Sequence, residues 1–249
     1  MTILEIVLLI TIGFFSGFIN VMAAGGSMFV IPFLIFLGVS PSEANATNRL
    51  AILLHTTVAV TTFKQKKVLD FKTDRFFIIP TLLGAIIGAI FAVDINEDIL
   101  ETIIGALLIL MFLIFLFNPS KLMKNTEHRI YNQHPIIRFL VLFLIGLYSG
   151  FIQMGVGFFI LANLIFTSRM DLLKANAIKS LTVFLCTVVA TGIFIYNDLI
   201  IWETGLILAL GNMLGAYLAT SLSVKIGTKY IRYFVLFALV AVATKMLFF

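Results

Sequence analysis

The sequence predicts an all-α integral membrane protein made of two inverted-topology repeats. Three observations lead to this fold class: the composition, the length of the apolar segments and an internal duplication. Of the 249 residues, 61% are hydrophobic and only 12% are charged, and the mean hydropathy is +1.13. Soluble domains are roughly half apolar. The lipid bilayer is therefore the expected surrounding of this chain.

Apolar stretches long enough to cross a membrane recur along the chain. A helix needs about 20 apolar residues to cross the hydrocarbon layer, and residues 3–24, 76–93, 99–117 and 231–249 approach or exceed this length. A transmembrane β-barrel would alternate apolar and polar positions, whereas residues 107–117 are continuously apolar. The spans are therefore expected to be helices.

The sequence also repeats itself once. Residues 13–20, GFFSGFIN, recur as residues 146–153, GLYSGFIQ. Further matches follow in the same order, and they pair Gly26 with Gly157, residues 44–46 with 175–177, and residues 84–89 with 211–216. We therefore expect two related halves that share one structural plan.

Each half should contain five helical segments, which gives roughly eight to ten spans in all. The expected segments are 3–24, 27–38, 43–63, 76–93 and 99–117, followed by 137–154, 157–168, 172–195, 201–223 and 231–248. The expected organisation is a first repeat at residues 1–117, a cytoplasmic linker at 118–136 and a second repeat at 137–249.

Charged residues in the connections predict that the two halves have opposite orientations. The connection 64–75 carries five basic residues, and the connection 94–98 carries three acidic ones. In the second half the order is reversed, because the connection 197–203 is acidic and 224–232 is basic. Basic loops stay in the cytoplasm. Inverted repeats are a recurrent plan of secondary transporters, although some channels share it.

Several other function classes are not supported by the sequence. Twelve of the 17 basic residues lie in three polar connections and no helix face carries a basic stripe, so no nucleic-acid partner is expected. No Ser-His-Asp, HExxH, P-loop or paired-carboxylate pattern is present, which argues against an enzyme, a metal site or a bound cofactor. A non-transporting scaffold or sensor remains as an alternative, although the longest polar stretch, 118–135, is under 20 residues.

The two shortest segments, 27–38 and 157–168, have about 12 residues each and would be only ~18 Å long as helices, too short to cross the hydrocarbon. Each follows a glycine-rich break, which contains Gly25, Gly26 and Ser27 in the first half and Gly155 and Gly157 in the second. Helix starts carry unpaired N–H groups and partial positive charge. Two such starts would favour a small anion, and close packing of small residues is the alternative.

Glycines also occur in pairs spaced by four residues, at 13 and 17, 84 and 88, 146 and 150, and 211 and 215. This spacing places both glycines of a pair on one helix face. We expect close helix packing at these pairs rather than ligand binding.

The third segment of each half opens with a polar cluster: Asn45, Asn48 and Arg49 in the first half, and Asn176, Lys179 and Ser180 in the second. Ionisable residues this far inside a span are candidates for substrate binding. The alternative is that both cations reach the membrane interface, and Arg49 could also pair with Glu43. His55, in mid-segment, is interpreted as a structural histidine or as a proton relay.

Together these residues resemble a known family, the sulfite exporter TauE/SafE group of bacterial membrane permeases. The likeness is carried by the glycine pair at 13 and 17, Gly25-Gly26 followed by Pro32, the turn at residues 38–44, residues 46–48 and the repeated second half. Asn163 departs from the pattern, since a proline is expected there opposite Pro32.

The resemblance implies a multi-pass permease of the bacterial cytoplasmic membrane. Its implied substrate is a sulfur-containing anion, such as sulfite or an organosulfonate, and transport would be coupled to a proton or sodium gradient. Gly25, Gly26 and Asn48 and, more loosely, Gly155, Gly157 and Lys179 are the residues that the resemblance carries over as lining candidates.

The charge pattern makes a prediction about topology. Both chain termini should lie outside the cell membrane, with the connections 64–75 and 225–232 on the cytoplasmic side. Reporter enzymes fused to each terminus, one active only outside and one only inside, measure this directly. Terminal fusions that are active only inside the cell would refute the assignment.

Overall fold

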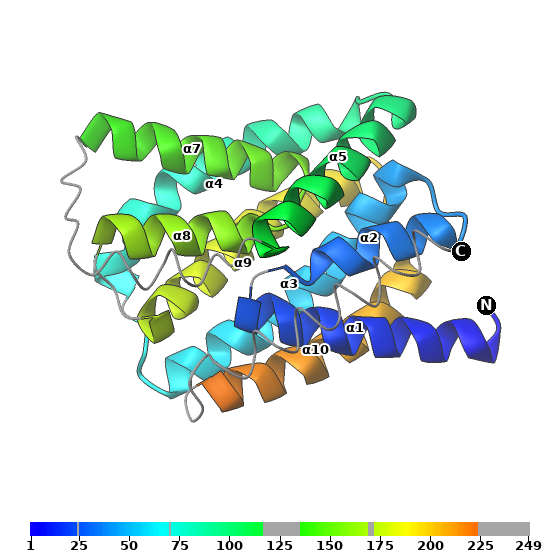
Figure 1. The fold of residues 1–249 in the computed structure, drawn as a ribbon, viewed down its shortest axis with the longest axis horizontal. Helices are drawn as coiled ribbons and strands as arrows, with labels where there is room; N and C mark the ends of the chain where they lie inside the picture. Colours follow the sequence, from blue (N-terminus) through cyan, green and yellow to red (C-terminus); the bar gives the residue numbers. More distant parts are fainter. Residues whose placement is uncertain (24, 70, 117–134, 169–171, 224–249) are drawn as a thin grey trace.

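The computed structural model describes residues 1–23, 25–69, 71–116, 135–168 and 172–223. Within these ranges the chain is all helical (Figure 1). The helices of the first half are α1 (Ile3–Ala23), α2 (Ser27–Phe36), α3 (Pro41–Gln65), α4 (Phe71–Val93) and α5 (Glu97–Leu116). Those of the second half are α7 (Pro135–Phe151), α8 (Val156–Ser168), α9 (Leu172–Tyr196) and α10 (Trp202–Ser223).

The helix bounds follow the sequence prediction closely. The largest difference at a helix start is in α4, which begins five residues earlier than expected, at Phe71. At the helix ends it is in α7, which stops at Phe151 instead of continuing to 154. The expected segment 231–248 and most of the linker 118–136 lie outside the described residues.

Four of the described helices are long and apolar enough to cross a membrane: α1, α4, α9 and α10. Their outer faces carry large apolar side chains, such as Phe91, which is 64% exposed. The helices α2 and α8 have 10 and 13 residues, or roughly 15 to 20 Å of helix. As expected, these two are too short to span the hydrocarbon alone.

The helices pack in two groups. In one group α10 contacts both α1 and α3, and in the other α4 contacts both α7 and α9. Helices α3 and α9 also contact each other. Figure 1 shows α1 and α7 entering from opposite ends of the molecule. In the same view, the short helices α2 and α8 begin near the middle and run toward opposite ends. The interior therefore lies along the α3–α9 contact.

The spaced glycine pairs hold the two groups together internally, as the sequence predicted. A methyl group on Gly13 or Gly17 of α1 would overlap the backbone of Leu208 or Asn212 in α10. The pair Gly211 and Gly215 of α10 faces the α1 backbone in return. The same reciprocal contact joins the pair at 84 and 88 in α4 to the pair at 146 and 150 in α7. Backbone lies directly against backbone in both places.

These contacts predict the outcome of a glycine substitution. Gly17→Ala should lower the free energy of unfolding by about 1–3 kcal/mol, because the new methyl group has to displace the Asn212 carbonyl. Gly105→Ala is the matched control, since nothing lies within 4 Å of the added carbon, and alanine is the better helix former there. Thermal unfolding in detergent measures both. Equal midpoints for the two variants would contradict this account of the packing.

Candidate functional site

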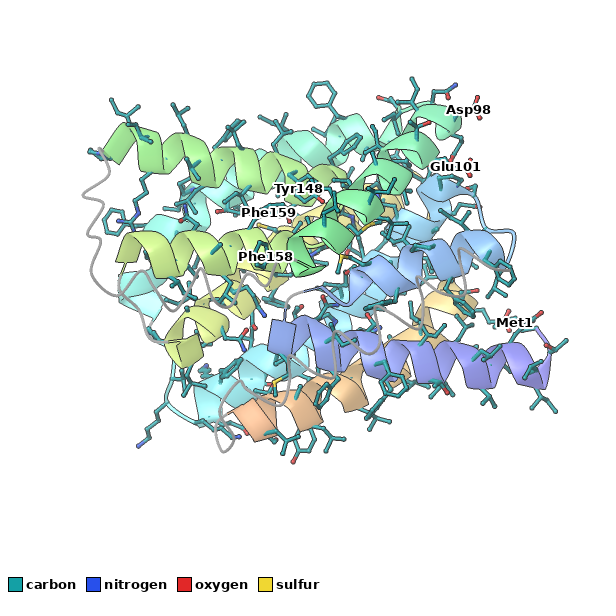
Figure 2. All side chains as sticks on the ribbon, viewed as in Figure 1. Met1, Asp98, Glu101, Tyr148, Phe158 and Phe159 are labelled. Atoms are coloured by element: carbon teal, nitrogen blue, oxygen red, sulfur yellow. The ribbon has the colours of Figure 1, made fainter. Side chains whose placement is uncertain are left out.

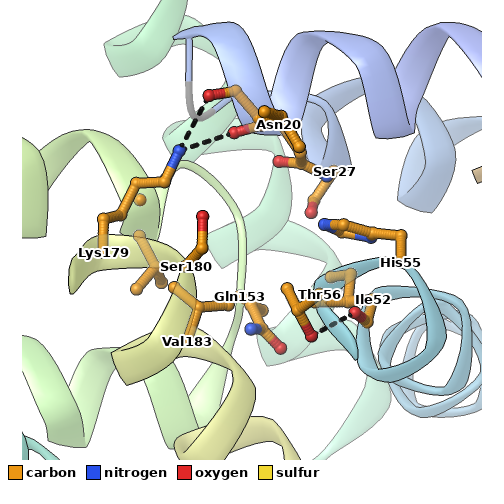
Figure 3. Close-up of a pocket in the computed structure, with 12 residues that line it drawn as sticks. Asn20, Ser27, Ile52, His55, Thr56, Gln153, Lys179, Ser180 and Val183 are labelled. Carbon is orange, nitrogen blue, oxygen red and sulfur yellow. Dashed lines mark hydrogen bonds between the residues drawn. The ribbon is translucent and has the colours of Figure 1, made fainter. Parts of the chain in front are cut away.

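A small cavity lies in the interior, between the two helix groups. The polar side chains that line it belong to Asn20, Ser27, His55, Thr56, Gln153, Lys179 and Ser180 (Figure 3). The space inside it that the centre of a water molecule can reach is about 20 Å³. That is room for about one water molecule. The cavity is therefore narrow. It lies where α1 ends and where α2 and α8 begin.

The starts of the two short helices both line this cavity. Ser27 is the first residue of α2, and Val156 and Gly157 are the first two of α8; all three line the cavity. Gly155 before α8 has a φ of +69°, a left-handed conformation that glycine adopts without strain. The glycine break therefore turns the chain sharply so that α8 can start at the cavity wall.

Lys179 supplies the positive charge of the cavity. It is only 3% exposed, which excludes the alternative that it reaches the membrane interface. Its Nζ donates hydrogen bonds to the carbonyl oxygens of Asn20 at 2.9 Å and Val21 at 3.1 Å. These carbonyls belong to the last turn of α1, where helical donors are missing and the dipole is negative. An ammonium has three N–H groups, so one remains for a ligand.

Arg49 makes the matching contact in the other half. It is fully buried and donates from Nη1 to the Ser149 carbonyl at 2.7 Å and from Nη2 to the Gly150 carbonyl at 2.6 Å. These carbonyls lie in the last turn of α7. Of the alternatives that the sequence left open for Arg49, the pairing with Glu43 does not occur in the described residues. Glu43 accepts a hydrogen bond from the Ser40 hydroxyl instead, at 2.9 Å, as part of the cap of α3.

The two cations therefore form crossed helix caps. Lys179 extends from α9 in the second half to the end of α1 in the first. Arg49 extends from α3 in the first half to the end of α7 in the second. Arg49 does not line the cavity itself, but it donates to Gln153 Oε1 at 3.2 Å, and Gln153 does line it. Both charges are thus held next to the cavity by backbone carbonyls rather than by carboxylates.

The electrostatic character of the cavity follows from the residues that line it. Among the described residues that line it, Lys179 alone carries a charge, and no carboxylate is present. The hydroxyls of Thr56 and Ser180 donate to carbonyls of their own helices, and Gln153 Nε2 donates to Thr187 Oγ1. Lys179 and the two helix starts are therefore the features of the cavity that suit an anion better than a cation.

Comparison with known proteins identifies the family. The family model described as "Sulfite exporter TauE/SafE" matches residues 9–246. The chain belongs to the TauE/SafE family. The family and the relatives described next are membrane transporters rather than enzymes, and the chain is accordingly a multi-pass membrane protein of the bacterial inner membrane.

Curated relatives of this TauE/SafE chain share its length. The probable membrane transporter protein ORF9 of a Sinorhizobium species is 28% identical over 94% of this chain and 89% of its own. YfcA of Escherichia coli K12, also a probable membrane transporter protein, is 28% identical over 94% and 86%. A Haemophilus influenzae protein with the same description is 26% identical over 97% and 94%. No solved structure matches the chain significantly.

Within this TauE/SafE fold, four of the residues predicted to bind substrate line the cavity: Ser27, Gly157, Lys179 and Ser180. Seven others do not: Gly25, Gly26, Asn45, Asn48, Arg49, Gly155 and Asn176. Several of these seven instead position the cavity wall. The Gly26 amide donates to Asn20 Oδ1 at 2.9 Å, and Asn45 Nδ2 donates to the Phe151 carbonyl at 3.0 Å. A direct role in binding for the seven stays a prediction.

Asn48 and Asn176 are buried polar residues with unused hydrogen-bonding capacity. In the described part of the chain, neither side-chain atom of Asn48 has a partner, nor does Asn176 Oδ1. Buried amide groups are nearly always paired. The two residues therefore lie where a rearrangement of the helices or a water molecule could satisfy them.

Sequence reasoning missed part of the cavity wall. Asn20 and Gln153 occupy matched positions of the two repeats, and both line the cavity, so the repeat alignment contained a signal for them. His55 also lines it, is 3% exposed and points toward Ser27 (Figure 3). Its Nδ1 lies near the Ala51 carbonyl but makes no hydrogen bond of good geometry. Both interpretations of His55, as a structural residue and as a proton relay, stay predictions.

Proposed function

We propose that this protein is a secondary transporter that moves a small sulfur oxyanion, sulfite or an organosulfonate, through the membrane by alternating access. One observation carries the proposal. The cavity is lined by the starts of two half-length helices, and Lys179 is the one charged side chain among its described lining residues. Such a site would compensate the negative charge of an anion through the Lys179 ammonium and the two helix starts.

The small size of the cavity supports a transport cycle rather than a static binding site. The space of about 20 Å³ admits about one water molecule, which is less than a sulfite or sulfonate group needs. Substrate binding therefore requires the walls to separate. Separation toward one side of the membrane and then toward the other would give the site access to each side in turn.

We further propose that the two halves are inverted repeats around this cavity. The contacts support this, because α1 packs on α10 as its counterpart α7 packs on α4, and α3 packs on α10 as α9 packs on α4. Matched residues also face each other in the cavity: Asn20 with Gln153, and Ile52 with Val183. The opposed courses of α1 and α7 in Figure 1 agree with opposite topology.

The same contacts suggest which units move. Each of the four spaced glycine pairs packs against a helix of the other half. The rigid units would therefore be mixed groups, α1 with α3 and α10, and α7 with α4 and α9, rather than the halves in sequence. The caps made by Lys179 and Arg49 both cross between these groups. Opening the cavity would require these caps to loosen or to pivot.

Lys179 provides the test of the proposed site. Lys179→Ala should weaken the binding of sulfite by roughly ten- to a hundredfold, because a hydrogen bond to a charged group contributes about 1.5–3 kcal/mol. Lys179→Arg should retain much of the affinity if charge alone is needed and lose it if a compact ammonium is required. Calorimetric titration of the purified protein in detergent measures the affinity.

Counterflow of labelled sulfite into proteoliposomes measures the transport itself. The parent protein and the control Lys66→Ala, which removes an exposed lysine, should accumulate label, whereas Lys179→Ala should not. Thermal unfolding checks that each variant is folded. A folded Lys179→Ala protein that binds and exchanges the anion as well as the parent protein would place the site elsewhere. Failure of the parent protein with every sulfur oxyanion and every small carboxylate tried would favour a non-transporting scaffold.

A further inference from the structure

We propose that His55 is the binding site of the coupling ion, and that this ion is a proton taken up together with the anion. The inference rests on the proposed function, because it needs an anion in the cavity. It extends that function by choosing between a proton and a sodium gradient, and by naming the residue that carries the charge.

The position of His55 fits this role. It lies in the middle of α3, with Asn45 and Arg49 one to three turns before it on the same helix. Its imidazole shares the cavity with Lys179, Ser27 and Ser180 (Figure 3). It is nearly buried and has no hydrogen bond of good geometry at Nδ1. An imidazole so placed can accept or release a proton only through the cavity, and that is where the substrate would be.

The charges around His55 come from few elements. On α9, Lys179 lines the same cavity, while Cys186 does not. The helices α2 and α8 contain no ionisable residue, and α1 contains only Glu5, in its first turn. On α10, Glu203 and Tyr217 are both exposed. On α3 itself, Arg49 is fixed to carbonyls of α7, and Glu43 lies in the first turn. No carboxylate of the described residues lines the cavity.

This arrangement couples the proton to the anion. With the cavity empty of anion, a protonated His55 would place a second positive charge beside Lys179 in a site shielded from water, where like charges repel strongly. A sulfur oxyanion between the two groups would offset both charges. Each ligand therefore favours the other, and the coupling is reciprocal. Loading with either one alone is disfavoured, which is what a proton–anion symporter needs.

The same inventory argues against sodium as the coupling ion at this cavity. A metal cation needs several oxygen ligands, and hard cations in proteins usually include carboxylates among them. The cavity offers the cation Lys179 and no carboxylate. A proton needs only one basic nitrogen. Two described lining residues carry one: Lys179, whose ammonium donates to two carbonyls of α1, and His55, whose Nδ1 has no such partner.

The test measures how many protons the protein takes up for each anion that it binds. The purified protein in detergent is titrated in weak buffer with sulfite, sulfate and ethanesulfonate, while a pH indicator records proton uptake. Sulfate and ethanesulfonate stay ionised near neutral pH, so they contribute no protons of their own. The parent protein should take up close to one proton per anion bound. Its affinity for the anion should fall by up to about tenfold for each pH unit as the pH rises above the value at which His55 releases its proton.

His55→Gln should abolish the proton uptake and make the affinity independent of pH between about pH 5 and 8. Thr57→Val is the matched control, because Thr57 is the exposed neighbour on α3 and donates to the Leu53 carbonyl. It should behave as the parent protein does. If His55→Gln does not fold, His55→Asn takes its place.

The outcomes separate this inference from the proposed function. Anion binding that depends on Lys179 but brings no proton with it would overturn the inference and leave the proposed function standing. Unchanged proton uptake in a folded His55 variant would overturn it as well. If none of the three anions binds in a way that depends on Lys179, the proposed function fails and the inference fails with it.

Discussion

The structure depends on how two buried cations are satisfied in a protein that has lipid around it. Lys179 and Arg49 are 3% and 0% exposed, and an uncompensated charge at such a depth is very costly. Within the described residues, neither is paired with a carboxylate. Both donate instead to carbonyls in the last turn of a helix, α1 for Lys179 and α7 for Arg49. Those carbonyls need donors in any case, so one contact satisfies two groups that lipid would leave unpaired.

Several other features follow from this arrangement. The helices α1 and α7 have to end inside the protein, so each is followed by a glycine-rich break. The chain then restarts as a short helix, and the starts of α2 and α8 lie at the same cavity as Lys179. Negative helix ends bind the protein's own cations, and positive helix starts remain for a ligand. In this account the fold itself produces a site that favours an anion.

The glycine contacts account for the stiffness of the surrounding framework. Backbone lies against backbone where α1 meets α10 and where α4 meets α7, and such contacts tolerate little adjustment. Movement would therefore occur at the contact between α3 and α9, where the cavity lies. Because each rigid group draws helices from both halves, a displacement at this contact changes both halves together. Helices of both repeats would therefore move together in each rigid group.

Much of this could be predicted from the sequence. Continuous apolar runs gave the helix bounds, and glycines spaced by four residues indicated close packing. The repeat also identified the two short helices and Lys179 as candidates for the site, although it left open whether Lys179 reached the membrane interface. The partners of the two cations could not be predicted, because the sequence around a side chain does not show which distant backbone carbonyl it will contact. The bond from Arg49 to Gly150 spans 101 residues, whereas the sequence suggested the nearby Glu43.

The role of His55 was equally hard to predict from the sequence. His55 lies in the middle of α3 between Leu54 and Thr56, and these neighbours do not show which face of the helix meets a cavity. Only the packing of α9 and α2 against α3 shows that it faces the cavity. Matched positions in the repeat were informative where both residues were polar, as for Asn20 and Gln153. Matched positions gave no information where a polar residue has an apolar counterpart, as His55 has in Cys186.

The central claim is that the starts of α2 and α8 and Lys179 form one anion site. Anomalous diffraction from crystals soaked in selenite, the heavier analogue of sulfite, tests it most directly. The account predicts a selenium peak between Lys179 and the first residues of α2 and α8, in a cavity wider than the one described here. Selenium bound only elsewhere, with this cavity unchanged, would contradict it.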